Sequence, residues 1–211
     1  MARTQIGIIG AGNMGAAFAR RLATAGYTLT VTANDPAHAE HAAAEAGPNA
    51  RAVRPREVAD GADLLLLAVP YAAAADALRA AGDLAGKTVV DMTNPLTPDM
   101  AGLVVGHTSS AAEELQRAVP NAHVVKAFNT LFAGLLTAPA GPTKAQVLYA
   151  GDDAGAKDAV RALADALGFE PVDAGPLANA RQLEPLGLLN IYLGYVAGRG
   201  TGVAPAWVTV A

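Results

Sequence analysis

The chain has 211 residues, a formal charge of −4, no cysteine and a hydrophobic fraction of 52%. That length suits one α/β domain, or one domain with a small appendage, and the apolar content is ample for a core. The acidic balance excludes a basic footprint for nucleic acid, and the lack of cysteine excludes disulfides, thiolate catalysis and cysteine metal sites.

Short apolar runs alternate with longer, alanine-rich segments along the chain. The runs predict strands at 5–9, 29–33, 63–69, 88–92, 123–127, 146–150 and 170–172. The alanine-rich segments predict helices at 14–25, 36–46, 72–81, 111–118 and 154–167. Ser110 and Glu113 form an S-x-x-E capping box that opens the fourth of these helices. The alternation predicts an α/β protein with a doubly wound parallel sheet.

The end of the chain has a different character. Residues 177–196 form an apolar helix candidate, which we expect Pro185 and Gly187 to interrupt. Residues 197–211 are punctuated by glycine and proline and predict an irregular arm. The helix is too apolar to stand alone on the surface, so we expect it to cover the core, a dimer interface, or both.

The first predicted strand leads directly into a G-x-G-x-x-G loop. Gly10 allows the tight turn, Gly12 lets the backbone approach a pyrophosphate, and Gly15 lets the helix pack on the strand. The helix begins with Asn13 and Met14, where free N–H groups favour an anion. The loop predicts a Rossmann-like fold that binds a dinucleotide; the alternative is a tight turn without a ligand.

The residue that reads the adenosine ribose is expected about 20 positions after the last glycine, at Asp35. A carboxylate there accepts hydrogen bonds from the ribose and repels a 2′-phosphate. No Arg or Lys lies between residues 27 and 50, so the sequence favours NAD(H) over NADP(H). Asn34 can bond either form of the ribose. The alternative is that Asp35 only caps a helix whose first residue is Pro36.

Two further strand ends are expected at the cofactor. Val69 and Pro70 follow one strand, and Asn94 and Pro95 follow the next. Each proline fixes the chain as it leaves the sheet, so that backbone groups face the cofactor. Asn94 offers donor and acceptor groups beside the expected nicotinamide. The alternative is a pair of ordinary loop prolines with an Asx turn.

Polar and aromatic residues cluster after the strand at 123–127. We expect Phe128, Asn129, Thr130 and Phe132, together with Asn94, to form the mouth for a second ligand, the hydride donor or acceptor. The alternative is that both phenylalanines belong to the core and that Asn129 caps a helix.

Several motifs together resemble a known family. They are V-K-A-F-N-T at 125–130, G-D-D at 151–153 and D-A-G-P-L at 173–177, followed by Arg181 and Glu184. In order and spacing they are similar to the coenzyme F420-dependent NADP oxidoreductases and to the cytosolic oxidoreductase domain of the STEAP metalloreductases.

The resemblance implies a dinucleotide-binding domain at 1–150 and a small C-terminal part at 151–211, a helical extension that covers the acceptor site and contributes to a dimer contact. It also implies direct hydride exchange between a nicotinamide and a flavin or deazaflavin. Proximity and orientation of two rings would carry most of that catalysis.

The chain departs from the family at three points. Asn34, Asp35 and Pro36 stand where members that use NADP tend to carry Ser and Arg. Asn129 stands where the deazaflavin reductases tend to carry His, and it resembles the STEAP branch instead. The STEAP membrane domain is absent from this sequence, so we do not expect electron transfer to a haem within it.

No paired carboxylates and no Ser/His/Asp set are recognisable, so the catalytic residue stays unassigned, with Asn129 and His107 as candidates. His107 would act as a general acid on a carbonyl or imine. His38 and His41, with Glu45, have a spacing that can hold a metal, but we interpret them as a solvated face and expect no metal.

These observations predict an NAD(P)-dependent oxidoreductase that exchanges a hydride with a flavin, deazaflavin or similar small molecule. The alternatives are a reductase of a small imine or carbonyl in secondary metabolism and a non-catalytic dinucleotide-binding module. No run of about 18 apolar residues and no signal peptide is apparent, so we expect a cytoplasmic protein without a membrane partner. The charge argues against a nucleic-acid partner, and the resemblance implies a homodimer.

Overall fold

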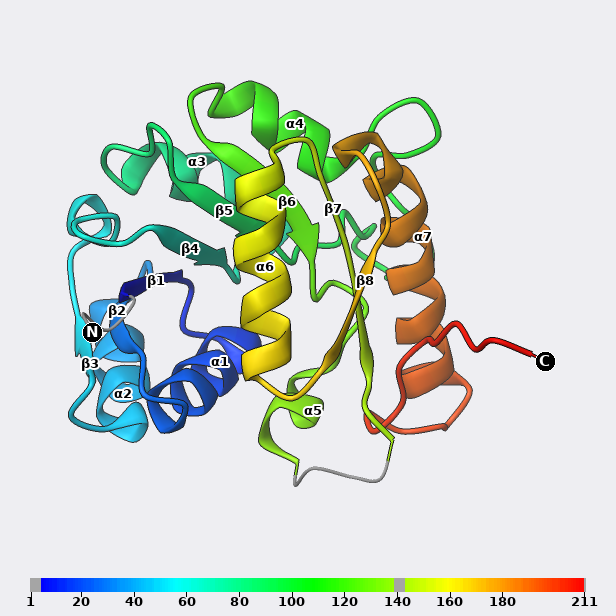
Figure 1. The fold of residues 1–211 in the computed structure, drawn as a ribbon, viewed down its shortest axis with the longest axis horizontal. Helices are drawn as coiled ribbons and strands as arrows, with labels where there is room; N and C mark the ends of the chain where they lie inside the picture. Colours follow the sequence, from blue (N-terminus) through cyan, green and yellow to red (C-terminus); the bar gives the residue numbers. More distant parts are fainter. Residues whose placement is uncertain (1–4, 139–142, 211) are drawn as a thin grey trace.

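A computed structural model describes residues 5–138 and 143–210 of the chain (Figure 1). Its strands are β1 (Gln5–Ile9), β2 (Thr28–Thr32), β3 (Ala50–Ala52), β4 (Leu64–Leu67), β5 (Thr88–Asp91), β6 (His123–Ala127), β7 (Gln146–Gly151) and β8 (Glu170–Asp173). Its α-helices are α1 (Asn13–Thr24), α2 (Pro36–Ala46), α3 (Tyr71–Ala80), α4 (Ala111–Ala118), α5 (Ala133–Thr137), α6 (Ala154–Ala166) and α7 (Ala180–Ile191). Short 3₁₀ segments η1 (Pro55–Glu57) and η2 (Leu177–Asn179) and the π-helical segment η3 (Tyr192–Val196) complete the elements.

The strands form one eight-stranded sheet in the order β3-β2-β1-β4-β5-β6-β7-β8. The first six strands are parallel, and the order reverses between β1 and β4, which is the crevice where α/β sheets bind ligands. The predicted Rossmann-like, doubly wound α/β class is therefore confirmed. One junction differs from an all-parallel sheet, because β7 pairs with β6 antiparallel and β8 then follows β7 in parallel.

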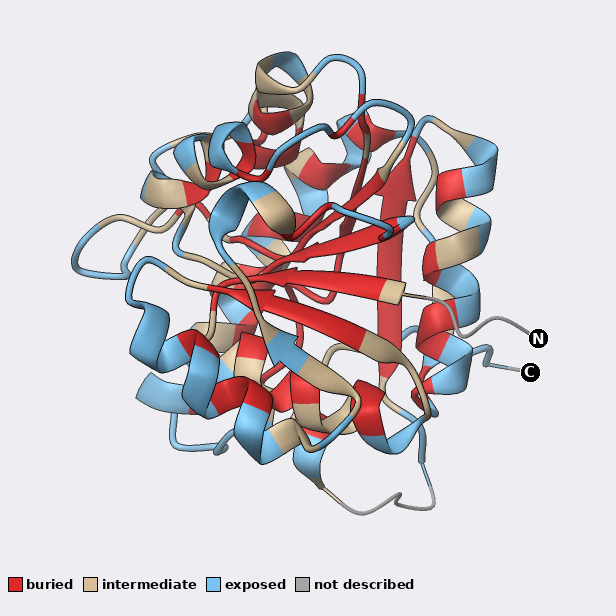
Figure 2. Ribbon diagram, turned by 90° about the vertical axis from the view of Figure 1, so that its left-hand side faces the viewer, coloured by how far each residue is buried: buried red, intermediate tan, exposed pale blue. Residues whose placement is uncertain are grey.

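Helices cover both faces of the sheet. One face packs against α1, α2 and α6, and its core includes Phe18, which meets Phe128 edge to face at a centroid distance of 5.1 Å. The other face packs against α3 and α4, and α7 covers the β7–β8 end. Figure 2 shows the consequence: the inner strands are buried almost throughout, while the helices expose only their outer faces. The edge strands β3 and β8 are partly exposed.

Three elements were not expected from the sequence: β3, η1 and α5. The three residues of β3, Ala-Arg-Ala, have little β-propensity, and the strand forms because β2 offers a free edge. The five residues of α5 carry no side-chain cap and no helical hydrophobic period. Such short elements depend on tertiary contacts, which local sequence does not encode.

The expected interruption of the last helix was wrong. Helix α7 continues through Pro185 and Gly187 and then widens into the π-helical segment. The predicted irregular arm is confirmed for residues 197–210, and residue 211 lies outside the described part. Within the described ranges, no helix has both the length and the apolarity needed to cross a bilayer. The sheet runs on through β7 across residue 150, and the division into two parts at that point stays a prediction.

Candidate functional site

A cavity of about 850 Å³ lies at the crevice between the carboxyl ends of β1, β2 and β4 and one face of α3. Six of the predicted cofactor residues line it: Gly10, Gly12, Asn34, Asp35, Val69 and Pro70. Asn13 lines an adjoining cavity of about 520 Å³, and Met14 packs against the core beside it. The glycine loop and the ends of β2 and β4 therefore meet in one hollow, whereas Asn94 and Pro95, which follow β5, do not line it.

The N-terminus of α1 at this hollow has no side-chain cap. By contrast, α2, α4 and α6 are capped by Asp35, Ser110 and Asp153, each of which accepts a hydrogen bond from a backbone N–H two or three residues ahead. Unpaired N–H groups at a helix start, next to a glycine turn, form a receptor for a phosphate-like anion. The starts of α3, α5 and α7 also lack a side-chain cap, so what sets α1 apart is the glycine turn directly before it at the cavity.

The three loop glycines differ in what a side chain would meet. A Cβ at Gly15 would lie 1.9 Å from the carbonyl oxygen of Gly10, and a Cβ at Gly10 would lie 2.3 Å from that of Ala68. A Cβ at Gly12 would meet no heavy atom within 4 Å. Gly10 and Gly15 are therefore required by packing, whereas no protein atom occupies the space beside Gly12.

Asp35 caps α2 through one oxygen, which accepts a hydrogen bond from the Ala37 N–H at 2.9 Å. Its other oxygen lies 4.0 Å from Nε2 of His38, and the side chain of Asp35 is 57% exposed. The capping role is thus confirmed, and the ribose role stays a prediction that this geometry permits.

The second predicted cluster sits at the ends of β5 and β6, beyond the cavity lining. Asn94 donates to the carbonyl oxygen of Asn129 at 2.8 Å, and Asn129 donates in return to Oδ1 of Asn94 at 3.0 Å. Asn129 also donates to the carbonyl oxygen of Leu183 in α7 at 2.8 Å. A Cβ at Gly187 would lie 2.5 Å from Oδ1 of Asn94, so this glycine lets α7 rest directly on the asparagine pair.

The aromatic members of that cluster belong largely to the interior. Phe128 is fully buried against Phe18 and Phe169, and its backbone has a φ of 62°, a conformation costly for any residue but glycine. Phe132 is buried under η3, where its ring meets that of Tyr195 at 5.2 Å. Buried Thr130 is tied to α7, because Asn190 donates to its carbonyl oxygen at 3.0 Å.

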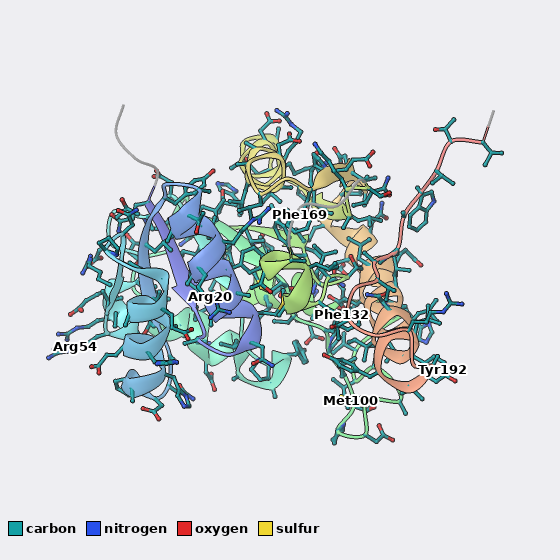
Figure 3. The ribbon with its side chains drawn as sticks, turned by 90° about the horizontal axis from the view of Figure 1, so that it is seen from below. Arg20, Arg54, Met100, Phe132, Phe169 and Tyr192 are labelled. Carbon is teal, nitrogen blue, oxygen red and sulfur yellow. The ribbon has the colours of Figure 1, made fainter. Side chains whose placement is uncertain are left out.

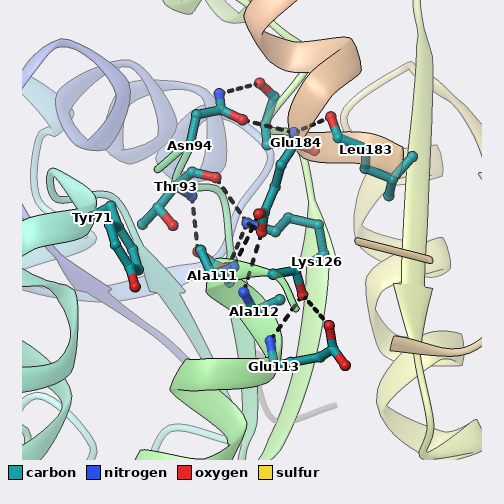
Figure 4. A network of polar contacts seen from close by, with 12 residues as sticks. Tyr71, Thr93, Asn94, Ala111, Ala112, Glu113, Lys126, Leu183 and Glu184 are labelled. Carbon is teal, nitrogen blue, oxygen red and sulfur yellow. Dashed lines mark hydrogen bonds and ion pairs between the residues drawn. The ribbon is translucent and has the colours of Figure 1, made fainter. Parts of the chain in front are cut away.

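A buried charge network links these strand ends to α7 (Figure 4). Lys126 is fully buried, and its Nζ lies 2.7 Å from Oδ2 of Asp91 and 2.8 Å from Oε1 of Glu184. The same Nζ donates to the carbonyl oxygen of Thr93 at 2.8 Å, directly before Asn94. Burial raises the pKa of the Glu184 carboxyl, and the Lys126 ammonium opposes that rise.

Glu184 also stabilises the start of α4. Its two oxygens accept hydrogen bonds from the N–H groups of Ala111 at 2.9 Å and Ala112 at 3.2 Å. Sequence reasoning noted Glu184 only through the family resemblance and gave Lys126 no role. The available signal was a lysine inside a strand predicted to be buried, since such a charge requires a partner.

Two other histidines, His41 and His107, do not line the cavity of about 850 Å³. His107 is exposed on the loop before α4, lines none of the cavities described above and stays an untested candidate acid. His41 approaches Glu45 at 3.5 Å, and Glu45 is already engaged by Arg20 at 2.5 Å. Among the described residues no group of three His, Asp or Glu side chains is arranged to hold a metal ion.

Comparison with known proteins gives a consistent result. The model of the family described as NADP oxidoreductase, coenzyme F420-dependent, matches residues 5–95. A structure from Arthrobacter sp. FB24, to which F420-dependent NADP reductase activity is ascribed, superposes with a TM-score of 0.82 at 33% identity and covers 95% of this chain and 97% of its own.

Curated relatives include the metalloreductase STEAP3 of Rattus norvegicus, which is 34% identical over 187 residues. The match covers 88% of this chain, but the chain spans only 37% of the length of that metalloreductase. The F420-dependent NADP reductase of Methanocaldococcus jannaschii is 28% identical over 155 residues, 70% of each chain. A reductive aminase of Aspergillus terreus has a TM-score of 0.68 at 25% identity, over 93% of this chain and 64% of the aminase.

Proposed function

Because the chain belongs to the family of coenzyme F420-dependent NADP oxidoreductases, we propose that it moves a hydride between a nicotinamide dinucleotide and a flavin, deazaflavin or similar acceptor. The observation that carries the proposal is the uncapped start of α1, where Gly12 leaves room for a diphosphate. When bound, the nicotinamide supplies the hydride chemistry, and the protein supplies binding and orientation.

The residues around the crevice have distinct tasks in this proposal. The amides of α1 hold the diphosphate, Asn34 and Asp35 bind the adenosine ribose, and Val69 and Pro70 form the wall beside it. Asn94 and Pro95 lie next to the nicotinamide end. Asn129 holds Asn94 and α7 in register, so that the acceptor meets a fixed surface.

The buried polar groups of the site support catalysis by oriented hydrogen-bonding groups rather than by groups that gain or lose a proton. Oγ1 of Thr93, Oδ1 of Asn129 and Oγ1 of Thr130 are buried, and none has a hydrogen-bond partner within the described part of the chain. Buried polar atoms of this kind usually obtain a partner from water or a ligand. They lie just beyond β5 and β6, where the hydride partner would approach.

The test is a titration followed by an acceptor panel. We expect NADH or NADPH to bind with saturable fluorescence, and its absorbance at the reduced nicotinamide band to fall when a deazaflavin or flavin is added. Oxidation by small imines or ketones, but not by flavins, would establish the second candidate, which the similarity to the reductive aminase supports. Binding without turnover of any acceptor would favour the non-catalytic module.

The cofactor preference rests on Asp35, and we propose that NAD(H) binds more tightly than NADP(H) at neutral pH. Replacing Asp35 with Arg removes the carboxylate that repels a 2′-phosphate, so the ratio of kcat/KM for NADPH to that for NADH should rise by about tenfold. Asp35→Asn is the matched control, because it keeps a capping oxygen and removes only the charge. An unmoved ratio in Asp35→Arg would mean that Asp35 serves only as the helix cap.

Two further expectations belong to this proposal. Leu189, Tyr192, Tyr195 and Trp207 are more than half exposed on α7, η3 and the arm, and this apolar surface supports a homodimer. A cytoplasmic location also stays a prediction.

A further inference from the structure

We infer that the buried cluster of Asp91, Lys126 and Glu184 carries a net negative charge that favours the oxidised, cationic form of the bound nicotinamide over the reduced, neutral form. The inference depends on the proposed function, because it assumes that the nicotinamide lies beside Asn94. It gives the cluster a role in the reaction in addition to its role in stability.

The charge of the cluster follows from its composition. Two carboxylates, those of Asp91 at 2.7 Å and Glu184 at 2.8 Å, face the single ammonium of Lys126, so one negative charge is left over. All three residues are buried, and charges in the interior of a protein are screened far less than charges at its surface. The excess charge therefore acts beyond its immediate neighbours.

The charged groups around the cluster do not cancel this excess. Arg181 of α7 pairs with Glu113 at 2.5 Å, and Arg117 of α4 lies 4.0 Å from Glu114, so each of these arginines is matched by a carboxylate. The N–H groups at the start of α4 bond to Glu184, but hydrogen bonds leave the total charge unchanged. The cluster and its surroundings together therefore remain negative.

The cluster lies directly behind the strand ends where the nicotinamide is expected. Asp91 ends β5, and Lys126 is the last residue but one of β6. Nζ of Lys126 donates to the carbonyl oxygen of Thr93 at 2.8 Å, and Asn94 is the next residue in the chain (Figure 4). A ring beside Asn94 would thus be among the nearest neighbours of the excess charge.

The two halves of the carboxyl edge differ in the side chains that they present. Figure 3 shows Arg20 and Arg54 on the half formed by α1 and α2, and Met100, Phe132 and Tyr192 on the half beyond β5 and β6. Met100 and Tyr192 are more than half exposed, so apolar groups surround the expected place of the acceptor. We therefore expect the ring to meet the charge of the cluster rather than that of either labelled arginine.

The consequence follows from the charge of the nicotinamide ring. A hydride, one proton with two electrons, passes from C4 of the reduced ring to the acceptor, so the ring changes from neutral to a charge of +1 and the acceptor gains both electrons. A negative charge nearby stabilises the cationic ring and has little effect on the neutral one. The cluster should therefore lower the reduction potential of the bound couple and favour hydride donation by the reduced cofactor.

The experiment measures the dissociation constants of NAD+ and NADH by calorimetry at about pH 8, where carboxylates are ionised. We expect Glu184→Gln, which brings the cluster to zero charge, to raise the ratio of Kd for NAD+ to Kd for NADH about tenfold, as expected for a unit charge acting over about 12 Å at an effective dielectric constant of about 20. A tenfold change corresponds to a rise of about 30 mV in the potential of the bound two-electron couple. Asp91→Asn should shift the ratio in the same direction.

Two further variants separate the effect of charge from that of structure. Lys126→Met combined with Glu184→Gln leaves one carboxylate and restores the net negative charge, so the ratio should return to the wild-type value. Asp60→Asn is the matched control, because it removes an exposed carboxylate at the start of β1, where Gln5 donates to the Asp60 carbonyl oxygen at 2.6 Å. It should leave the ratio unchanged.

Three results would contradict the inference. An unmoved ratio in both Glu184→Gln and Asp91→Asn would show that the charge of the cluster does not reach the ring. A ratio that stays raised in the double variant would assign the effect to altered structure. Failure of both nucleotides to bind the wild type would overturn the dinucleotide site, and the inference with it.

Discussion

Replacing Lys126 with Met should lower the free energy of unfolding by about 3–5 kcal/mol, because the change leaves Asp91 and Glu184 buried and facing each other without a cation. For a chain of this length that loss corresponds to a fall of about 10 °C in Tm. Urea unfolding followed by circular dichroism measures the loss. The same change removes the hydrogen bond that Lys126 donates to the carbonyl oxygen of Thr93, so any folded variant should also bind the acceptor less well.

Lys157 provides the matched control. It pairs with Asp173 at 2.8 Å, but both side chains retain contact with solvent, so Lys157→Met should cost about 1 kcal/mol or less. Adding Glu184→Gln to Lys126→Met should recover part of the lost stability, since it removes one of the two uncompensated charges. Equal losses in the two lysine variants would show that the buried network contributes no more than a surface pair.

Replacing Gly12 with Val should weaken dinucleotide binding at least tenfold, about 1.4 kcal/mol, without unfolding the protein. Its φ of −74° is open to any residue, and a Cβ there meets no protein atom within 4 Å. The valine would therefore occupy the space that the diphosphate needs above the α1 amides. Fluorescence titration with NADH, together with a thermal melt of the free protein, tests both halves of this expectation.

Gly106→Val is the matched control, because Gly106 is equally open but lies outside the crevice lining. It should bind NADH as the wild type does. Gly12→Ala should show an intermediate loss, in keeping with its smaller side chain. Wild-type affinity in Gly12→Val would remove the diphosphate from the start of α1, and with it the main support for the proposed function.

The sequence predicted most of the fold for identifiable reasons. Buried parallel strands are continuous apolar runs, as in β4. A G-x-G-x-x-G loop between a strand and a helix is typical of a Rossmann-like fold. The crevice residues followed from strand ends that share one edge of the sheet. The capping role of Ser110 followed from a local motif, which the hydrogen bond from the Glu113 N–H confirms at 3.2 Å.

What escaped prediction depends on contacts between distant residues. The antiparallel entry of β7 is set by its pairing with β6, which no local pattern distinguishes from a parallel neighbour. The passage of α7 through Pro185 is possible because side chains of the strand ends hold the helix, including the bond from Asn129 to the Leu183 carbonyl. The Lys126 network likewise joins residues up to 93 positions apart (Asp91 and Glu184), each unremarkable alone.

The reversed direction of β7 also sets the direction of the helix dipole of α6 relative to the other helices. Helix α6 begins beside the start of β6, where Asp153 lies 3.8 Å from His123, so its positive end points away from the crevice, while α1, α2 and α3 direct theirs toward it. Helix α7 runs back the opposite way, and its negative end comes to rest over Thr130. We therefore expect a dinucleotide that binds here to place its phosphates at the half of the edge where α1, α2 and α3 begin, and its nicotinamide at the other half.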